Sequence, residues 1–132
     1  MAKILIVEDS PAQILIIRRF LEKAGHTAIV AEDGQAGVDM AMAQKPDLVL
    51  MDVIMPHLTG FQATRKITKD PATCHIPVVI LTTKDQETDK VWGLRQGARA
   101  YLTKPFNEAE LANAINDALL NAPAKGVAAL AR

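Results

Sequence analysis

A single carboxylate interrupts an otherwise apolar run in the stretch DLVLMDVIMP, which extends from Asp47 to Pro56. Asp52 follows four apolar residues and precedes three more, so it is not placed to cap a helix. A carboxyl group in such surroundings is costly unless it has a partner or a function. We therefore interpret Asp52 as a functional residue. A carboxylate is already anionic at neutral pH, so it could act as a nucleophile without a general base.

Polar residues that complement Asp52 follow three other apolar runs. Glu8 and Asp9 come after KILIV, Thr82 ends VVILT, and Lys104 follows YLT. Three carboxylates at ~4 Å and an effective dielectric near 20 repel one another by roughly 4 kcal/mol per pair. Either one is protonated or a cation lies among them, and an all-oxygen set without a histidine or cysteine pattern favours Mg²⁺. With an ammonium group and a hydroxyl to contact phosphoryl oxygens, the set could accept a phosphoryl group.

The elements that would hold these residues are five short strands that alternate with longer helical segments. Several of the strands are apolar throughout, which is typical of strands buried on both faces. Strict alternation predicts an α/β fold with a parallel sheet and helices on both faces, in which the strands' carboxyl ends share one edge. The predicted strands are Lys3–Val7, Thr27–Ala31, Asp47–Asp52, Pro77–Thr82 and Arg99–Thr103.

Capping signals mark the helices between these strands. Ser10, Pro11 and Gln13 predict an N-cap, a first-turn proline and a capping box for a helix that stops at Gly25. The later helices are predicted to start at Asp33-Gly34, Thr59-Gly60, about Asp85 and Asn107, with ends before Pro46, before Pro71 and at Gly97 for the first three of these. Trp92 falls in the fourth helix, where it either fills the core or contacts a partner.

Composition narrows the class of protein. The 132 residues fit one domain, and 15 basic residues balance 15 acidic ones, so no overall basic field attracts nucleic acid. A single cysteine, Cys74, suits a reducing compartment, and no long apolar segment suggests membrane insertion. The three histidines are scattered on predicted loops and are expected at the surface. We expect a cytoplasmic domain that binds neither nucleic acid nor a bilayer.

Four motifs now carry a family resemblance. KILIVEDS, LVLMDVIMP, VVILTT and YLTKPF, in this order, resemble the receiver domain of two-component response regulators, the chemotaxis-regulator-like fold. The resemblance covers residues 3 to about 120. It implies a flavodoxin-like, doubly wound sheet of five parallel strands in the order 2-1-3-4-5 with five helices. We expect the receiver domain to span residues 1–121 and a flexible tail to span residues 122–132.

The resemblance also implies roles for the polar residues around the acceptor. Asp52 would accept the phosphoryl group, and Glu8, Asp9, Asp52 and the backbone carbonyl of Ile54 would hold Mg²⁺. Two departures from the family pattern stand out. Glu8 replaces the commoner aspartate, and its extra methylene should still reach a metal-bound water. Ile54 carries no polar group that could position an attacking water.

A second set of residues would transmit the signal. By resemblance, Lys104 contacts the phosphoryl group and precedes Pro105 in a cis peptide bond, while Thr82 and Tyr101 form the switch. The face made by the fourth helix, fifth strand and fifth helix would then change its affinity for a partner. The alternative for Tyr101 is that it packs at the sheet edge with its hydroxyl in water. The fifth helix lies near the end of the sequence, so we expect the partner to be a separate output or motor protein.

The stretches GFQATRKITKD and TTKDQETDKVWGLRQGARAYLTKP resemble twitching-motility regulators of the PilH type, served by a chemosensory histidine kinase. The phosphoryl donor would then be a histidine kinase or a histidine phosphotransfer domain. Two other classes compete. An Mg²⁺-dependent phosphatase with an aspartate nucleophile needs a second acid two residues later, where this chain has Ile54. A flavin carrier needs a hydroxyl-rich loop after the first strand, where this chain has the acidic EDSPAQ.

Overall fold

Within residues 1–122, five strands alternate with five helices, as the sequence predicts. The computed structural model describes residues 1–122, so the predicted tail lies outside the described residues except for its first position. The elements are β1 Lys3–Val7, α1 Pro11–Lys23, β2 Thr27–Ala31, α2 Gly34–Gln44, β3 Leu48–Met51, α3 Gly60–Lys69, β4 Val78–Thr82, α4 Glu87–Arg95, β5 Ala100–Thr103 and α5 Glu108–Leu120.

The strands form one parallel sheet in the order β2-β1-β3-β4-β5, which confirms the predicted topology. The register of β1 shows how the strand ends align. Val7, the last residue of β1, is paired with Ala31 at the end of β2 and with Met51 at the end of β3. The residues that follow these strands therefore emerge at one edge of the sheet.

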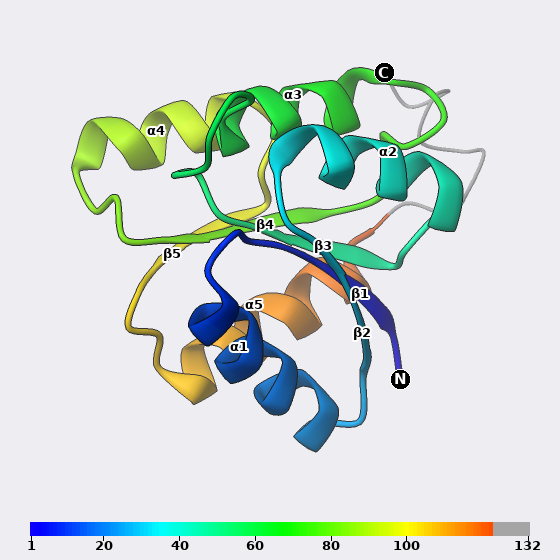
Figure 1. Ribbon diagram of the computed structural model, residues 1–132, viewed down its shortest axis with the longest axis vertical. Helices are drawn as coiled ribbons and strands as arrows, with labels where there is room; N and C mark the ends of the chain where they lie inside the picture. Colours follow the sequence, from blue (N-terminus) through cyan, green and yellow to red (C-terminus); the bar gives the residue numbers. More distant parts are fainter. Residues whose placement is uncertain (123–132) are drawn as a thin grey trace.

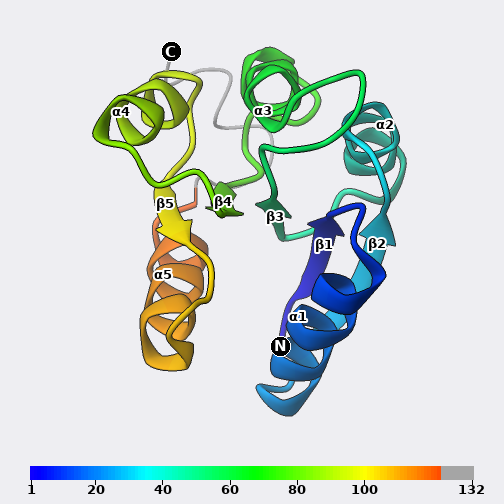
Figure 2. The ribbon, with the colours of Figure 1, turned by 60° about the vertical axis from the view of Figure 1, so that its left-hand side comes forward.

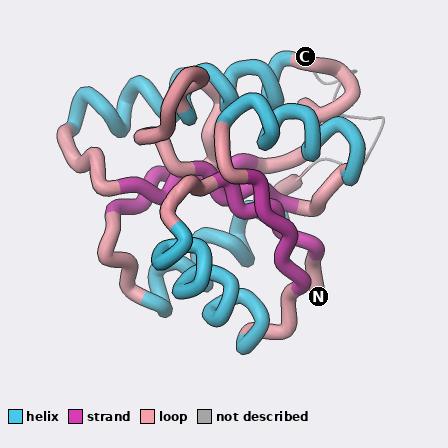
Figure 3. Tube along the Cα trace, viewed as in Figure 1, coloured by secondary structure: helices cyan, strands magenta, loops and turns pink. Residues whose placement is uncertain are grey.

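Helices cover both faces of the sheet. In Figure 1, α2, α3 and α4 lie on one face and α1 and α5 on the other, and Figure 2 shows the same layers turned by 60°. Figure 3 shows the strands as a thin layer between the two sets of helices. Within the described residues, no helix is both long enough and apolar enough to cross a membrane.

Two hydrophobic cores lie on the two faces of the sheet, and β1 contributes to both. Ile4 and Ile6 belong to the core on the α1 and α5 side, and Leu5 and Val7 belong to the core on the α2 and α3 side. This division follows from the two-residue period of a strand. All four side chains are at most 1 % exposed, and burying an aliphatic side chain of this size contributes about 1.5–3 kcal/mol. The sheet is therefore a rigid support for its carboxyl edge.

The first helix begins as predicted but lacks the predicted capping box. The Ser10 side chain accepts a hydrogen bond from the Gln13 amide at 3.4 Å. The Ser10 amide, however, donates to Glu8 Oε2 at 3.1 Å rather than to the Gln13 side chain. The capping-box prediction is therefore wrong at this helix, because a nearby carboxylate is the stronger acceptor. A full capping box is formed instead at α3, between Thr59 and Gln62.

The structure also settles three smaller expectations, which concern the start of α4, Trp92 and the histidines. Helix α4 begins at Glu87, two residues after its predicted start. Trp92 is 51 % exposed on this helix and does not fill the core. His26 is half-buried rather than exposed, and its Nδ1 atom accepts a hydrogen bond from the Ala2 amide at 3.1 Å. His75 is also half-buried, whereas His57 is exposed.

Candidate functional site

The polar residues predicted to meet are held at the carboxyl edge by backbone hydrogen bonds that continue the sheet. The Asp52 amide donates to the Val7 carbonyl at 3.0 Å, and the Lys104 amide donates to the Thr82 carbonyl at 2.8 Å. The Glu8 amide likewise donates to the last residue of β2 at 3.0 Å. Their positions are thus fixed by the strands rather than by mobile loops.

Three carboxylates converge at this edge. One oxygen each from Glu8, Asp9 and Asp52 lies within 4.8 Å of the other two. Glu8 and Asp52 are 2 % and 7 % exposed, whereas Asp9 is exposed to solvent. An all-oxygen cluster with one open side matches what Mg²⁺ needs, because this ion binds one or two carboxylates and keeps several waters. The chemistry of the donor set therefore fits the predicted metal.

Lys104 supplies positive charge within this cluster. Its side chain is 7 % exposed, and its Nζ atom forms ion pairs with Glu8 Oε1 and, at 3.7 Å, with Asp52 Oδ2. Burial raises the pKa of the Glu8 carboxyl above its ordinary value, and the hydrogen bonds from Lys104 and the Ser10 amide only partly offset this effect. The ammonium group thus lies between the predicted acceptor and a predicted metal ligand.

The second oxygen of Asp52 faces the loop after β3. Asp52 Oδ1 accepts a hydrogen bond from the Ile54 amide at 3.3 Å. The Ile54 side chain is 53 % exposed, so an apolar group with no acid or base function stands two residues after the acceptor. The role of the Ile54 carbonyl as a metal ligand stays a prediction.

Gly60 contributes to this site in a way that the sequence patterns did not predict. The Gly60 amide donates to the Val53 carbonyl at 3.1 Å. A Cβ atom at position 60 would lie 2.0 Å from the Asp52 carbonyl oxygen and 2.6 Å from the Val53 Cα atom. Glycine is therefore required for α3 to approach the backbone of the predicted acceptor. A glycine next to a helix N-cap was the available signal, but sequence alone does not reveal what the glycine approaches.

The two predicted switch residues are connected through Lys84. The Tyr101 hydroxyl donates to the Lys84 carbonyl at 2.8 Å, and the Lys84 amide donates to Thr82 Oγ1 at 3.4 Å. Thr82 is fully buried and Tyr101 is half-buried. Burial, followed by the charge of Asp89, raises the pKa of Tyr101 to about 12, so its hydroxyl remains a donor. The hydroxyl thus contacts the loop after β4, contrary to the packing alternative, which placed it in water.

The predicted cis peptide bond between Lys104 and Pro105 is confirmed. Of the predicted site residues, the structure brings together a group of four that lie in direct contact or near contact: Glu8, Asp9, Asp52 and Lys104. Thr82 lies on the neighbouring strand β4, with Tyr101 linked to it through the β4–α4 loop.

This fold and this acidic edge define a class of signalling proteins. The family model of the response regulator receiver domain matches residues 4–116, and the chain belongs to that family. Among individual relatives, it is 60 % identical to the protein PilH of Pseudomonas aeruginosa over 119 residues, which is 90 % of this chain and 98 % of PilH. It is 38 % identical to the transcriptional regulator PhoP of Bacillus subtilis, where the match covers 83 % of this chain but 45 % of PhoP.

Solved structures agree with this assignment. The chemotaxis protein CheY4 of Vibrio cholerae superposes with a TM-score of 0.82 at 30 % identity, over 89 % of this chain and 98 % of CheY4. A receiver domain of a sensor histidine kinase from Pseudomonas aeruginosa superposes with a TM-score of 0.84 at 32 % identity, over 91 % of this chain and 98 % of that one. That crystal structure has a magnesium ion coordinated in its active-site cleft.

Proposed function

We propose that this receiver domain accepts a phosphoryl group on Asp52 from a histidine kinase or a histidine phosphotransfer domain. The observation that carries the proposal is the convergence of Asp52 with Glu8, Asp9 and the Lys104 ammonium at one edge of the sheet. Asp52 is buried, and one of its oxygens already accepts a hydrogen bond from the Ile54 amide. This arrangement orients the carboxylate for attack and needs no general base.

In the proposed reaction, an Asp52 oxygen forms a bond to phosphorus while the P–N bond of the donor phosphohistidine breaks. The electron pair of that bond remains on the donor imidazole. Lys104 lies between Glu8 and Asp52, so a small displacement would bring its ammonium group to a phosphoryl oxygen. The Thr82 hydroxyl would donate a hydrogen bond to another phosphoryl oxygen.

Glu8, Asp9 and Asp52 are the side chains that would hold Mg²⁺, with the Ile54 carbonyl as a further predicted ligand. Bound Mg²⁺ supplies positive charge that offsets the charge of the transferring phosphoryl group. Because the Glu8 carboxylate is already engaged by Lys104 and by the Ser10 amide, we expect Asp9 and Asp52 to provide the direct carboxylate contacts and Glu8 to contact a metal-bound water.

The output would be a change in affinity for a separate output or motor protein. When Thr82 turns toward the phosphoryl group, the Lys84 loop loses its hydrogen bond to Thr82 Oγ1. Tyr101, bonded to the same loop, would then rearrange beside α4 and β5. From the likeness to PilH, we infer a chemosensory pathway that controls twitching motility, and we propose that the protein acts in the cytoplasm.

The protein would assist its own phosphorylation and dephosphorylation without acting as an enzyme on other molecules. The competing phosphatase function lacks its second acid, because Ile54 occupies that position.

Labelling tests the proposal directly. Acetyl phosphate with Mg²⁺ should add one acid-stable and base-labile phosphoryl group to the wild type and none to Asp52→Asn. Thr82→Ala should still be labelled, because Thr82 is not the acceptor. Undiminished labelling of Asp52→Asn would disprove the assignment, and turnover of a generic phosphate ester would favour the phosphatase.

A further inference from the structure

Helix α3 carries a basic surface outside the phosphorylation site. Its inward positions Ala63, Thr64, Ile67 and Thr68 are buried, and its outward positions Gln62, Arg65, Lys66 and Lys69 are exposed. These four outward residues have the spacing i, i+3, i+4 and i+7, which places them on one side of a helix. We call this side, together with Leu58 in the preceding loop, the α3 groove.

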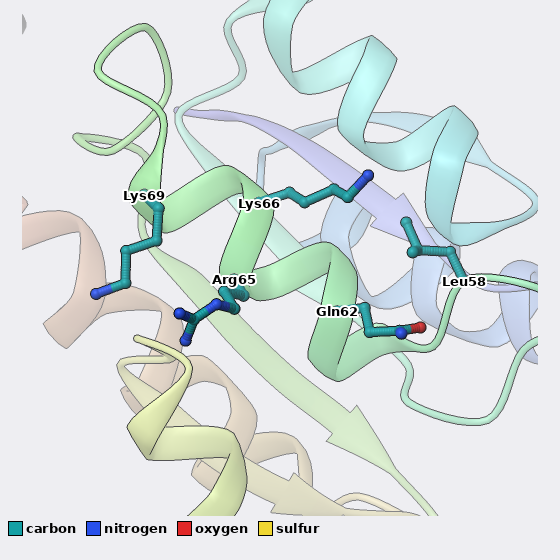
Figure 4. A pocket seen from close by; sticks show the side chains of 5 residues that line it. All are labelled: Leu58, Gln62, Arg65, Lys66 and Lys69. Carbon is teal, nitrogen blue, oxygen red and sulfur yellow. The ribbon is translucent and has the colours of Figure 1, made fainter.

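The α3 groove is a shallow cavity of about 430 Å³ lined by these five residues. Figure 4 shows Leu58 and Gln62 toward one end, Lys66 extended over the side nearest α2, and Arg65 and Lys69 directed the opposite way. The half-buried Leu58 side chain and the methylene stems of the basic residues provide an apolar lining.

The cations of the groove are not neutralised by neighbouring side chains. Within residues 1–122, Lys66 and Lys69 form neither an ion pair nor a side-chain hydrogen bond, and Arg65 makes one long contact of 3.5 Å to Gln96 Oε1. The whole chain has equal numbers of acidic and basic residues, so three cations on one helix side are a local concentration of charge. Such a surface attracts an anionic partner.

We propose that the α3 groove docks an acidic amphipathic helix of a partner protein. Carboxylates at positions i, i+3 or i+4, and i+7 of that helix would face Arg65, Lys66 and Lys69, and one apolar residue would pack on Leu58. The spacing of the cations matches the repeat of a second helix, and the apolar floor gives that helix an anchor.

Other occupants fit the groove less well. A nucleotide would need a stacking surface, and none of the lining residues is aromatic. A phosphate at the start of α3 would need free amides, but the Thr59 and Gln62 amides are occupied in the capping box. A second copy related by a two-fold axis would bring the same cations together, which is repulsive. An acidic protein helix satisfies both the charge and the apolar surface.

Docking at this position would also engage an element that touches the phosphorylation site. Gly60, the first residue of α3, is bonded to the Val53 carbonyl and lies against the Asp52 backbone. A partner on the α3 groove would therefore contact the molecule independently of the α4–β5–α5 face, yet through an element tied to the predicted acceptor. The docking itself does not depend on Asp52 being phosphorylated.

The test uses a designed, lactam-constrained helical peptide that carries glutamates at the matching spacing and one leucine on the same face. Its affinity is measured by fluorescence anisotropy, and its position by amide chemical-shift changes in the ¹⁵N-labelled full chain. We expect Lys66→Glu/Lys69→Glu to weaken binding at least tenfold and Leu58→Ser to weaken it severalfold. Peptides in which glutamine replaces glutamate, or serine replaces leucine, should bind the wild-type protein with lower affinity.

The matched control is Arg19→Glu/Lys23→Glu, which makes the same charge change at the same kind of exposed helical positions in α1. This variant should bind the peptide within about twofold of wild type, and circular dichroism verifies that both variants fold. Equal weakening in the control, or shifts centred away from α3, would overturn the proposal. Displacement of the peptide by inorganic phosphate at low concentration would also overturn the proposal. Self-association of the wild type that Lys66→Glu/Lys69→Glu abolishes would do the same.

Discussion

Lys104 should stabilise the folded protein through its buried ion pairs, and Lys104→Met isolates this contribution because methionine keeps the apolar stem. The Lys104 side chain is 7 % exposed and lies between Glu8 and Asp52, whose side chains are 3 % and 9 % exposed. Removing the ammonium group leaves carboxylates that are poorly solvated and mutually repulsive. We expect the free energy of unfolding to fall.

The size of this effect follows from the geometry. At 3.7 Å between Lys104 Nζ and Asp52 Oδ2, and with an effective dielectric near 20, the attraction is about 4.5 kcal/mol before the cost of desolvation. Losing one partner of a buried ion pair usually costs about 3–5 kcal/mol. Because burial already raises the pKa of Glu8, its protonation can relieve part of the strain in the variant. We therefore expect a loss of about 3 kcal/mol.

A double-mutant cycle tests the reasoning. Urea unfolding in Mg²⁺-free buffer at pH 7.5 gives the free energy of unfolding for the wild type, Glu8→Gln, Lys104→Met and the double variant. If the pair is formed as described, the loss in the double variant should be smaller than the sum of the single losses by about 2 kcal/mol. Additive losses, or a Lys104→Met variant as stable as the wild type, would refute the ion-pair argument.

Three further outcomes are expected. His26→Gln should flatten the pH dependence of the free energy of unfolding. Burial lowers the pKa of His26, so the contribution of His26 to stability is complete above about pH 6.5 and is lost as the pH falls below that value. Thermal unfolding between pH 7 and 5 measures this dependence. Gly60→Ala should cost more than about 2 kcal/mol, because its Cβ atom would overlap the Asp52 carbonyl, and urea unfolding would reveal it. Tyr101→Phe should lose the hydrogen bond to the Lys84 carbonyl, which lowers the free energy of unfolding by about 1 kcal/mol. The same variant should reduce the extent to which beryllofluoride tightens partner binding.

The fold was predictable because its signals are local and repeated. Apolar strand runs such as the one before Asp52 and caps such as Ser10 set the alternation of elements, and the motif resemblance supplied the strand order. The predicted end of β3 was wrong by one residue: the strand ends at Met51 rather than at Asp52, although the Asp52 amide still donates to the Val7 carbonyl. The beginning of α4 differed because Gln86 caps that helix without a side-chain hydrogen bond.

The membership of the site was predictable, but its pairings were not. Parallel strands carry their following residues to one edge, which brought Glu8, Asp52 and Lys104 together in the prediction. Which carboxylate pairs with Lys104 depends on side-chain geometry across strands that are distant in the sequence. The hydrogen bond from the Ser10 amide to Glu8, which replaces the predicted capping box, has the same origin. Sequence patterns report residue types and spacing, and such competition appears only in three dimensions.

The most direct test of the central claim is to locate the phosphoryl group chemically. The protein is incubated with acetyl phosphate and Mg²⁺, the acyl phosphate is reduced with borohydride, and tandem mass spectrometry identifies the residue converted to homoserine. We predict conversion at Asp52, dependent on both the phosphodonor and Mg²⁺. Conversion at Asp9, the corresponding reduction at Glu8, or no modification of the wild type under conditions that label a control receiver domain would contradict the proposed function.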